Sequence, residues 1–140
     1  MARRATVWLM ALDPRDPDLR SFWAERHLCT LSTLRADGSP HVVPVGVTFD
    51  ADHLLARVIT SGSSQKARNV ARVASGAARV AACQVDGRRW STLEGTARVS
   101  RDPDEVAEAV ERYAQRYRQP RVNPARVVLL IEVSKVLGSV

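Results

Sequence analysis

The chain has 140 residues, of which 45% are hydrophobic and 26% charged, and its formal net charge is +6. This length predicts one domain over residues 1–140, with residues 1–15 as an N-terminal extension, and the composition is that of a soluble globular protein. The apolar runs are too short to cross a bilayer, the first residues lack a convincing cleavage site, and the basic residues are spread out among few aromatics, so we expect a cytoplasmic protein that binds neither membrane nor nucleic acid.

The first half of the chain gives signals for a helix, a hairpin, a strand and a second helix. Asp13-Pro14 and Asp16-Pro17, followed by apolar residues at helical spacing, predict a short amphipathic helix over 16–26. HLCTLSTL and PHVVPVGVTF predict two strands joined at Asp37-Gly38, and Pro44 favours an edge position or a bulge for the second. LLARVIT predicts a third strand, and SSQKARNVARVA predicts a helix whose apolar face holds Ala67, Val70, Ala71 and Ala74.

The second half predicts a hairpin, a longer helix and a final strand. ARVAACQV and RWSTLEGTARVS are strand-like and are joined by a second Asp-Gly turn, Asp86-Gly87. Asp102-Pro103 begins a helix that ends by Gln119-Pro120, and RVVLLIEVSKV predicts the last strand. Six strands with hairpin connections and about three short helices predict a mainly β (α+β) fold, an antiparallel barrel that is closed or partly closed.

The sequence RVITSGSSQKARN, residues 57–69, passes from strand to helix through a glycine, several hydroxyls and a lysine. Gly62 allows a ligand to approach the backbone closely, and Ser63 and Ser64 fall at the expected N-cap and first turn, where free N–H groups attract anions. Lys66 is one of only two lysines in a chain that otherwise uses arginine. The junction is consistent with a phosphate site, and equally with a capped helix beside a solvated lysine.

Cysteine and histidine give no sign of a metal site. Cys29 and Cys83 stand in separate apolar runs, which predicts free thiols, and the three histidines are scattered along the chain. The chain also lacks a Walker motif and a GxGxxG motif, which disfavours nucleotide hydrolysis.

Four segments together resemble the pyridoxamine-5′-phosphate-oxidase-like split β-barrel family. They are TLRADGSPHVVPVGVTFD, RVITSGSSQKARN, QVDGRRWSTLEGTARV and YAQRYRQPRVNPARVV, and the similarity extends over roughly residues 18–138. Within that family the chain looks most like the actinobacterial biliverdin reductases that use the deazaflavin coenzyme F-420. The resemblance implies a six-stranded FMN-binding split barrel that forms a homodimer, with each cofactor held between the two subunits.

Carried over residue by residue, the resemblance assigns the cofactor site. It implies that residues of two neighbouring strands line the deazaflavin, that the strand-to-helix junction binds its phosphate, and that a third group approaches from the partner subunit or the far wall. These residues are His41, Val42 and Val43; Arg57, Val58 and Thr60; Ser61, Gly62, Ser63, Ser64, Gln65, Lys66 and Asn69; and Gln84, Val85 and Trp90.

The same resemblance implies hydride transfer from reduced coenzyme F-420 to an unsaturated substrate, most simply biliverdin to bilirubin. The cofactor carries this chemistry, which agrees with the lack of a catalytic triad or paired carboxylates, and the catalytic residues and the proton donor stay unknown. Biliverdin carries two propionates, so we expect arginines to bind it: Arg88, Arg89, Arg118 and Arg121.

Two other functions stay open on the sequence alone. The same fold could carry FMN and act on a pyridoxal vitamer, although the phosphate monoester of FMN favours more cationic partners than the diester of F-420. Alternatively, the protein could bind F-420 or a tetrapyrrole without turnover.

Overall fold

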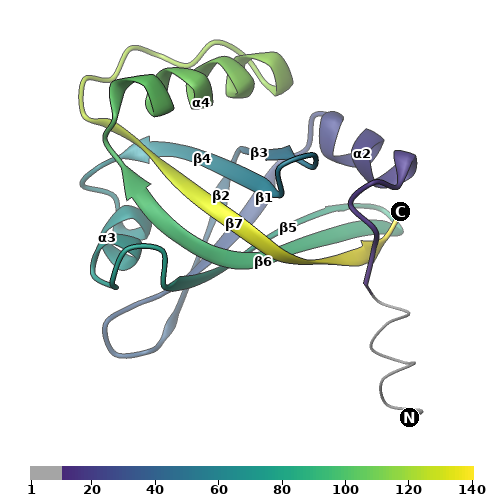
Figure 1. The fold of residues 1–140 in the computed structure, drawn as a ribbon, viewed down its shortest axis with the longest axis horizontal. Helices are drawn as coiled ribbons and strands as arrows, with labels where there is room; N and C mark the ends of the chain where they lie inside the picture. Colours follow the sequence, from purple (N-terminus) through teal and green to yellow (C-terminus); the bar gives the residue numbers. More distant parts are fainter. Residues whose placement is uncertain (1–10) are drawn as a thin grey trace.

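The computed structural model describes residues 11–140, so most of the predicted N-terminal extension lies outside the described residues. One seven-stranded antiparallel sheet runs in the order β2-β1-β5-β6-β7-β4-β3 (Figure 1). Its strands are β1 (Cys29–Leu34), β2 (Pro40–Val45), β3 (Val47–Asp50), β4 (Leu55–Ser61), β5 (Ala78–Asp86), β6 (Arg89–Ser100) and β7 (Arg126–Ser139). The helices are α2 (Pro17–Ala24), α3 (Gln65–Ala71) and α4 (Pro103–Arg116).

The described strands number seven rather than the predicted six because the return strand of the first hairpin divides at Gly46. A side chain there would not fit, since a Cβ on Gly46 would lie 2.6 Å from Cε2 of Tyr113 and 3.0 Å from Cε2 of Tyr117. β2 ends before Gly46 and β3 begins after it, and the two strands, although consecutive, form the two opposite edges of the sheet. A sheet whose edges are joined by one residue must curl, which confirms the split-barrel prediction and the edge position of Pro44.

The interior of the curled sheet is the main hydrophobic core, and two helices close its ends. α2 begins at the N-cap Asp16 and buries Leu19, Phe22 and Trp23, while α3 buries Ala67 and Val70. α3 is shorter than predicted: it ends at Ala71, which is exposed together with Ala74, and the buried Asn69 takes part of the expected apolar face. Figure 1 places α2 and α3 at opposite ends of the barrel.

The third helix, α4, lies on the outside of the barrel. Its buried Ala109 packs against Val128 and Leu130 of β7, with Ile59 of β4 beside them. In contrast, the packing described for α2, α3 and α4 leaves the outward face of β1, β5 and β6 without a covering helix. A groove of about 750 Å³ crosses this face and is lined in part by Ser32, Arg79, Ala81, Glu94 and Lys135. None of the described helices could span a bilayer.

Candidate functional site

The strand-to-helix junction at residues 61–64 forms a tight connection between β4 and α3. Ser64, not Ser63, is the N-cap: its Oγ accepts hydrogen bonds from the backbone N–H of Ala67 at 3.2 Å and from Oγ of Thr60 at 3.0 Å. The Ser64 N–H donates to the Ser61 carbonyl at 3.1 Å. The hydroxyl of Ser63 is left exposed, without a hydrogen-bond partner among residues 11–140.

Lys66 stands in the first turn of α3, and no carboxylate of the described chain forms an ion pair with it. Its side chain is half-buried, and this burial lowers the pKa of the amino group below its ordinary value. A cation that is partly buried and has no acidic partner has lost part of its hydration. Binding an anionic ligand beside it is favourable, because the ligand replaces the lost water. Lys66 thus presents an ammonium group without an acidic partner among the described residues, at the position where the sequence predicted the cation of an anion site.

One side of α3 ties the helix to the edge of the sheet where His41 lies. The Asn69 Nδ2 donates to Oγ1 of the buried Thr33 at 2.9 Å, and the Gln65 Nε2 donates to Oδ1 of Asn69 at 2.6 Å. Thr33 pairs with His41 across the β1–β2 ladder. The Nδ1 of His41 is buried and has no hydrogen-bond partner within the described residues.

These contacts change the roles that the sequence suggested for two residues. Asn69 and Gln65 use their amide groups to position α3, with the Oε1 of Gln65 also accepting from Arg68 at 2.8 Å. His41 instead has a free polar atom in a sheltered position, which is the kind of group that a ligand satisfies. The structure thus brings His41, Thr60 and the junction together around α3.

Strand alternation divides the other predicted strand residues between two faces. In β2, His41 and Val43 are half-buried, whereas Val42 is 60% exposed on the opposite face. In β4, Val58 belongs to the core, where it is 1% exposed, and Thr60 follows on the same face. Side chains of neighbouring residues in a strand cannot line one site together, so the predicted sets at 41–43 and 57–58 are only partly compatible with the structure.

Arg57 points away from Val58, toward α4. Burial and the nearby Arg112 both lower the pKa of its guanidinium, and its NH1 is buried without a hydrogen-bond partner in the part of the chain described. Its cross-strand partner is Leu130, whose side chain packs under α4. Arg57 consequently lies on the other side of β4 from Thr60.

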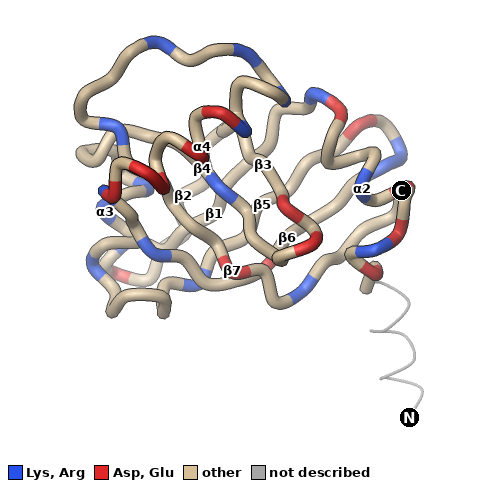
Figure 2. Tube along the Cα trace, turned by 45° about the horizontal axis from the view of Figure 1, so that its top comes forward, with Lys and Arg blue, Asp and Glu red and all other residues tan. Residues whose placement is uncertain are grey.

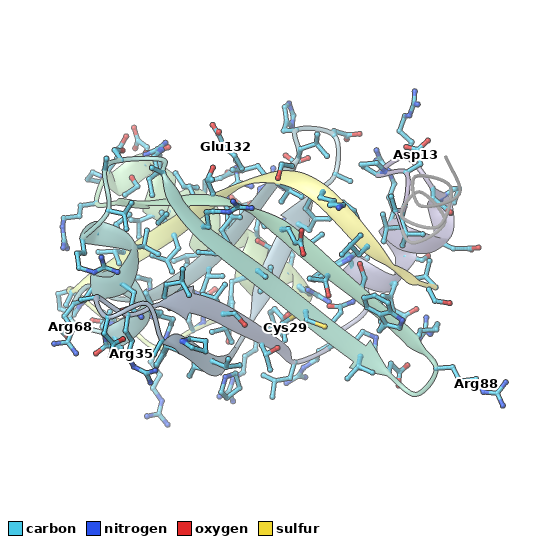
Figure 3. The ribbon with its side chains drawn as sticks, turned by 90° about the horizontal axis from the view of Figure 1, so that it is seen from below. Asp13, Cys29, Arg35, Arg68, Arg88 and Glu132 are labelled. Carbon is cyan, nitrogen blue, oxygen red and sulfur yellow. The ribbon has the colours of Figure 1, made fainter. Side chains whose placement is uncertain are left out.

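The β5–β6 hairpin residues lie far from the junction within one chain. β5 runs for nine residues from the α3 end to the hairpin, about 26 Å at the usual rise per residue. Figure 3 shows Arg88 at the hairpin tip and Arg68 of α3 at opposite ends of the molecule. Val85, 66% exposed, and its cross-strand partner Trp90 occupy the uncovered outward face.

Gln84 points inward and is 1% exposed. Its Nε2 donates to the Phe22 carbonyl at 2.9 Å, and its Oε1 accepts from NH2 of Arg116 at 2.6 Å. A ligand cannot reach this side chain as the subunit stands, so the predicted cofactor contact of Gln84 is not supported.

The side chain of Arg89 is also occupied by contacts within the protein. Its guanidinium contacts Glu25 at 2.9 Å and Asp86 at 2.6 Å, and it stacks 4.7 Å from the centre of the Phe22 ring. Hydrogen bonds from Arg89 and His27 lower the pKa of Glu25 to about 2. The ligand atoms of Glu25, His27 and Asp86 lie within 4.8 Å of one another, but both carboxylates are already paired with Arg89. The predicted role of Arg89 in substrate binding is therefore not supported.

Arg118 and Arg121 are exposed on the segment that connects α4 to β7. This segment reaches the junction: Nδ2 of Asn123 donates to Oγ of Ser61 at 2.9 Å, and the Gly62 N–H donates to the Ala125 carbonyl at 2.9 Å. Arg121 thus stands two residues from a group that fixes the junction, whereas Arg88 is at the far hairpin.

Three residues that sequence reasoning did not predict contact α3 or the junction. Thr33 anchors α3, Asn123 holds Ser61, and the guanidinium of Arg101 lies against Gly62. Each comes from a segment distant in sequence, and no local motif marks it, so only the pairing of strands could have revealed these contacts.

Comparison with known proteins places these features in a family. The sequence profile described as pyridoxamine 5′-phosphate oxidase matches residues 16–139. A curated F-420H(2)-dependent biliverdin reductase of Mycobacterium tuberculosis is 57% identical over 122 residues, which cover 87% of this chain and 86% of the relative.

Solved structures share the fold at low sequence identity. A conserved hypothetical protein from Mycobacterium tuberculosis is similar with a TM-score of 0.74 and 21% identity, covering 92% of this chain and 85% of its own. A protein described as an F-420 reductase has a TM-score of 0.66 and 22% identity, covering 84% of this chain and 94% of its own. With a profile match over nearly all of the described residues and a 57% identical relative, the chain belongs to the pyridoxamine 5′-phosphate oxidase family.

Proposed function

We propose that this protein is a coenzyme F-420-dependent reductase that transfers a hydride to biliverdin and yields bilirubin. The observation that carries the proposal is the 57% identity, over 87% of the chain, with a protein named as an F-420H(2)-dependent biliverdin reductase. The unpaired Lys66 at a glycine- and serine-containing junction supports it, because the phosphate of the coenzyme needs such a cation.

The residues of the α3 end fit such a cofactor. Lys66 and the exposed Ser63 would hold its phosphate, with Gly62 providing close approach to the backbone. The buried, unpartnered Nδ1 of His41 would take a polar atom of the ring system, beside the half-buried Val43. Asn69, Gln65 and Thr60 would act indirectly, because their side chains position α3 and the N-cap Ser64.

The bound coenzyme supplies the hydride, and the protein supplies binding, orientation and exclusion of water. Val43 on β2 and the core beneath Thr60 give an apolar surface for a planar ring. The arginines that could meet the substrate propionates are reduced to Arg88, Arg118 and Arg121, because Arg89 is paired with Glu25 and Asp86.

We further propose that the active form is a homodimer whose sites need both subunits. No helix within residues 11–140 covers the outward face of β1, β5 and β6, and Val85 and Trp90 lie on that face far from the junction. If two copies pack through this face in antiparallel orientation, the hairpin of one subunit reaches the α3 end of the other. Cys29 and Cys83 are free thiols, in keeping with a protein that acts in the reducing cytoplasm.

A direct assay tests the reaction. The purified protein is mixed anaerobically with reduced F-420 and biliverdin, and the absorption band of biliverdin is followed together with reoxidation of the cofactor. We expect one molecule of F-420 to be reoxidised for each molecule of biliverdin consumed. A parallel sample with reduced FMN serves as the comparison. Turnover with FMN alone, or cofactor binding without loss of biliverdin, would contradict the proposal.

A complementation experiment tests the shared site. Lys66→Ala and Trp90→Ala are each expected to impair activity, while a heterodimer of the two has one site that carries neither change. Refolding an equal mixture should then restore about a quarter of the wild-type sites by random pairing. If mixing gives no more activity than the average of the two variants, Lys66 and Trp90 do not form one site across subunits.

A further inference from the structure

Arg101 is a basic residue of the α3 end that the family resemblance did not indicate. It follows the last residue of β6 and precedes the N-cap of α4. The guanidinium lies directly against the backbone of the junction: a Cβ placed on Gly62 would be 2.7 Å from its NH1 and 3.5 Å from its Cζ. Figure 2 shows basic positions from several segments gathered around α3, with acidic positions among them.

The acidic neighbours of Arg101 along the chain are occupied by other groups. The Oδ1 of Asp102 accepts from the Asp104 N–H at 3.0 Å and caps α4. The carboxylate of Glu105 binds Oγ of Ser100 at 2.7 Å and NH2 of Arg98 at 3.0 Å. Within residues 11–140 Arg101 has neither an ion pair nor a hydrogen bond from its side chain, so its five donors are available.

The absence of a side chain at residue 62 is what gives Arg101 its position. Any Cβ there would displace the guanidinium, whereas the bare glycine lets it lie against residue 62. Lys66 follows in the first turn of the next helix, also without a carboxylate partner in the described chain. Two unpaired cations from different segments therefore stand at one short stretch of backbone.

We propose that Arg101 is a second cationic ligand of the cofactor phosphate, which it holds together with Lys66. The inference rests on the proposed function, since it assumes that the coenzyme binds at this junction. A phosphodiester presents two non-bridging oxygens; the planar guanidinium suits paired contacts to them, whereas an ammonium acts as a point charge. Arg101 would then set the preference for cofactors that carry a phosphate.

The test compares the affinity of three deazaflavins by fluorescence titration or calorimetry, without turnover. They are intact F-420, the form with the phosphate but no glutamyl residues, and the parent alcohol without the phosphate. Arg101→Ala should weaken the first two about tenfold, as expected for loss of one charge-assisted contact, and leave the third unchanged. Arg101→Lys should recover part of the affinity.

Two further variants guard against a general structural effect. Arg26→Ala removes an exposed arginine next to α2, at the opposite end of the barrel from α3, and should leave all three affinities unchanged. Gly62→Ala should weaken phosphate-bearing ligands both by displacing the guanidinium and by obstructing close approach to the backbone, so its effect should be smaller, but not absent, in an Arg101→Ala background.

The outcomes distinguish a failure of the role proposed for Arg101 from a failure of the proposed phosphate site. If Lys66→Ala weakens binding and Arg101→Ala does not, the role of Arg101 is overturned while the junction stays the phosphate site. If neither matters, the site itself is wrong. A loss of affinity confined to glutamyl-bearing F-420 would assign Arg101 to the glutamyl tail and overturn the phosphate contact. An equal loss of affinity for the parent alcohol would show a structural effect and would overturn the phosphate contact as well.

Discussion

The two ends of the barrel use cationic side chains in opposite ways. At the α2 end, Arg89 is held between Glu25 and Asp86, and Arg116 donates to the carbonyl groups of Glu25 and Val47 and to Oε1 of Gln84. At the α3 end, Lys66 and Arg101 have no acidic partner within residues 11–140. Residues of the same charge are thus structural at one end and available for a ligand at the other.

The difference shows that availability, rather than residue type, marks a binding cation. A guanidinium whose donors are all taken by protein oxygens is stable where it lies and gains little from a new anion. A half-buried cation without a partner has lost solvation that a bound anion can replace. The comparison predicts that changes at the α2 end affect folding and changes at the α3 end affect cofactor affinity.

The largest expected effect is that of Arg116→Ala on stability. The change removes the charged donor from the buried Oε1 of Gln84, which keeps only the weak thiol donor of Cys29. It also removes the donor from the Glu25 carbonyl and one of two donors from the Val47 carbonyl, which keeps the hydroxyl of Tyr117, and it removes stacking on Trp23 and Tyr117. We expect the free energy of unfolding to fall by about 2–4 kcal/mol, because several hydrogen bonds from one charged group are lost together. Urea denaturation measures it.

A variant at the α3 end, Arg101→Ala, is the control for Arg116→Ala. Arg101→Ala should change the free energy of unfolding by less than about 0.5 kcal/mol, as is usual for an exposed side chain without a partner. Equal destabilisation by the two variants would remove the distinction between the two ends.

The pH dependence of cofactor binding gives a second, intermediate test. Burial lowers the pKa of Lys66 from its ordinary 10.5, and a bound phosphate favours the protonated amine, so affinity should fall as pH rises through the pKa of the free protein. The fall should therefore begin at a lower pH than that of an ordinary lysine. Titration with F-420 at several alkaline pH values measures this dependence of affinity on pH. The Lys66→Ala variant should bind F-420 weakly, and its affinity should not fall over the same pH range.

The smallest expected effect concerns the ion pairs at the α2 end. Glu25 has a pKa lowered from 4.5 to about 2, first by its hydrogen bond with Arg89 and then by the one with His27. Because the folded-state pKa is depressed, its stabilising contribution is complete above pH 4.5 and is lost as the pH falls toward 2. NMR titration of Arg89→Ala should show the pKa of Glu25 moving back toward 4.5. An unchanged pKa would show that Arg89 is not the main partner.

The sequence by itself determined most of the local structure and the centre of the site. Aspartates before prolines mark the starts of α2 and α4 at Asp16 and Asp102, and period-2 patterns mark the strands, because these signals lie within a few residues of one another. The resemblance and the unusual lysine likewise indicated the junction at 61–66, where Lys66 has no acidic partner in the described part of the chain.

Only the tertiary structure decided which predicted residues can reach that junction. Residue 46 has no room for a side chain because Tyr113 of α4 and the C-cap Tyr117 lie against it, and Gln84 is unavailable because Arg116 and Phe22 hold it inside the barrel. Arg101 reaches Gly62 because the ends of β6 and β4 flank β7. Such facts follow from strand register and from contacts between distant segments, and a linear pattern carries no information about the partner that a side chain will meet.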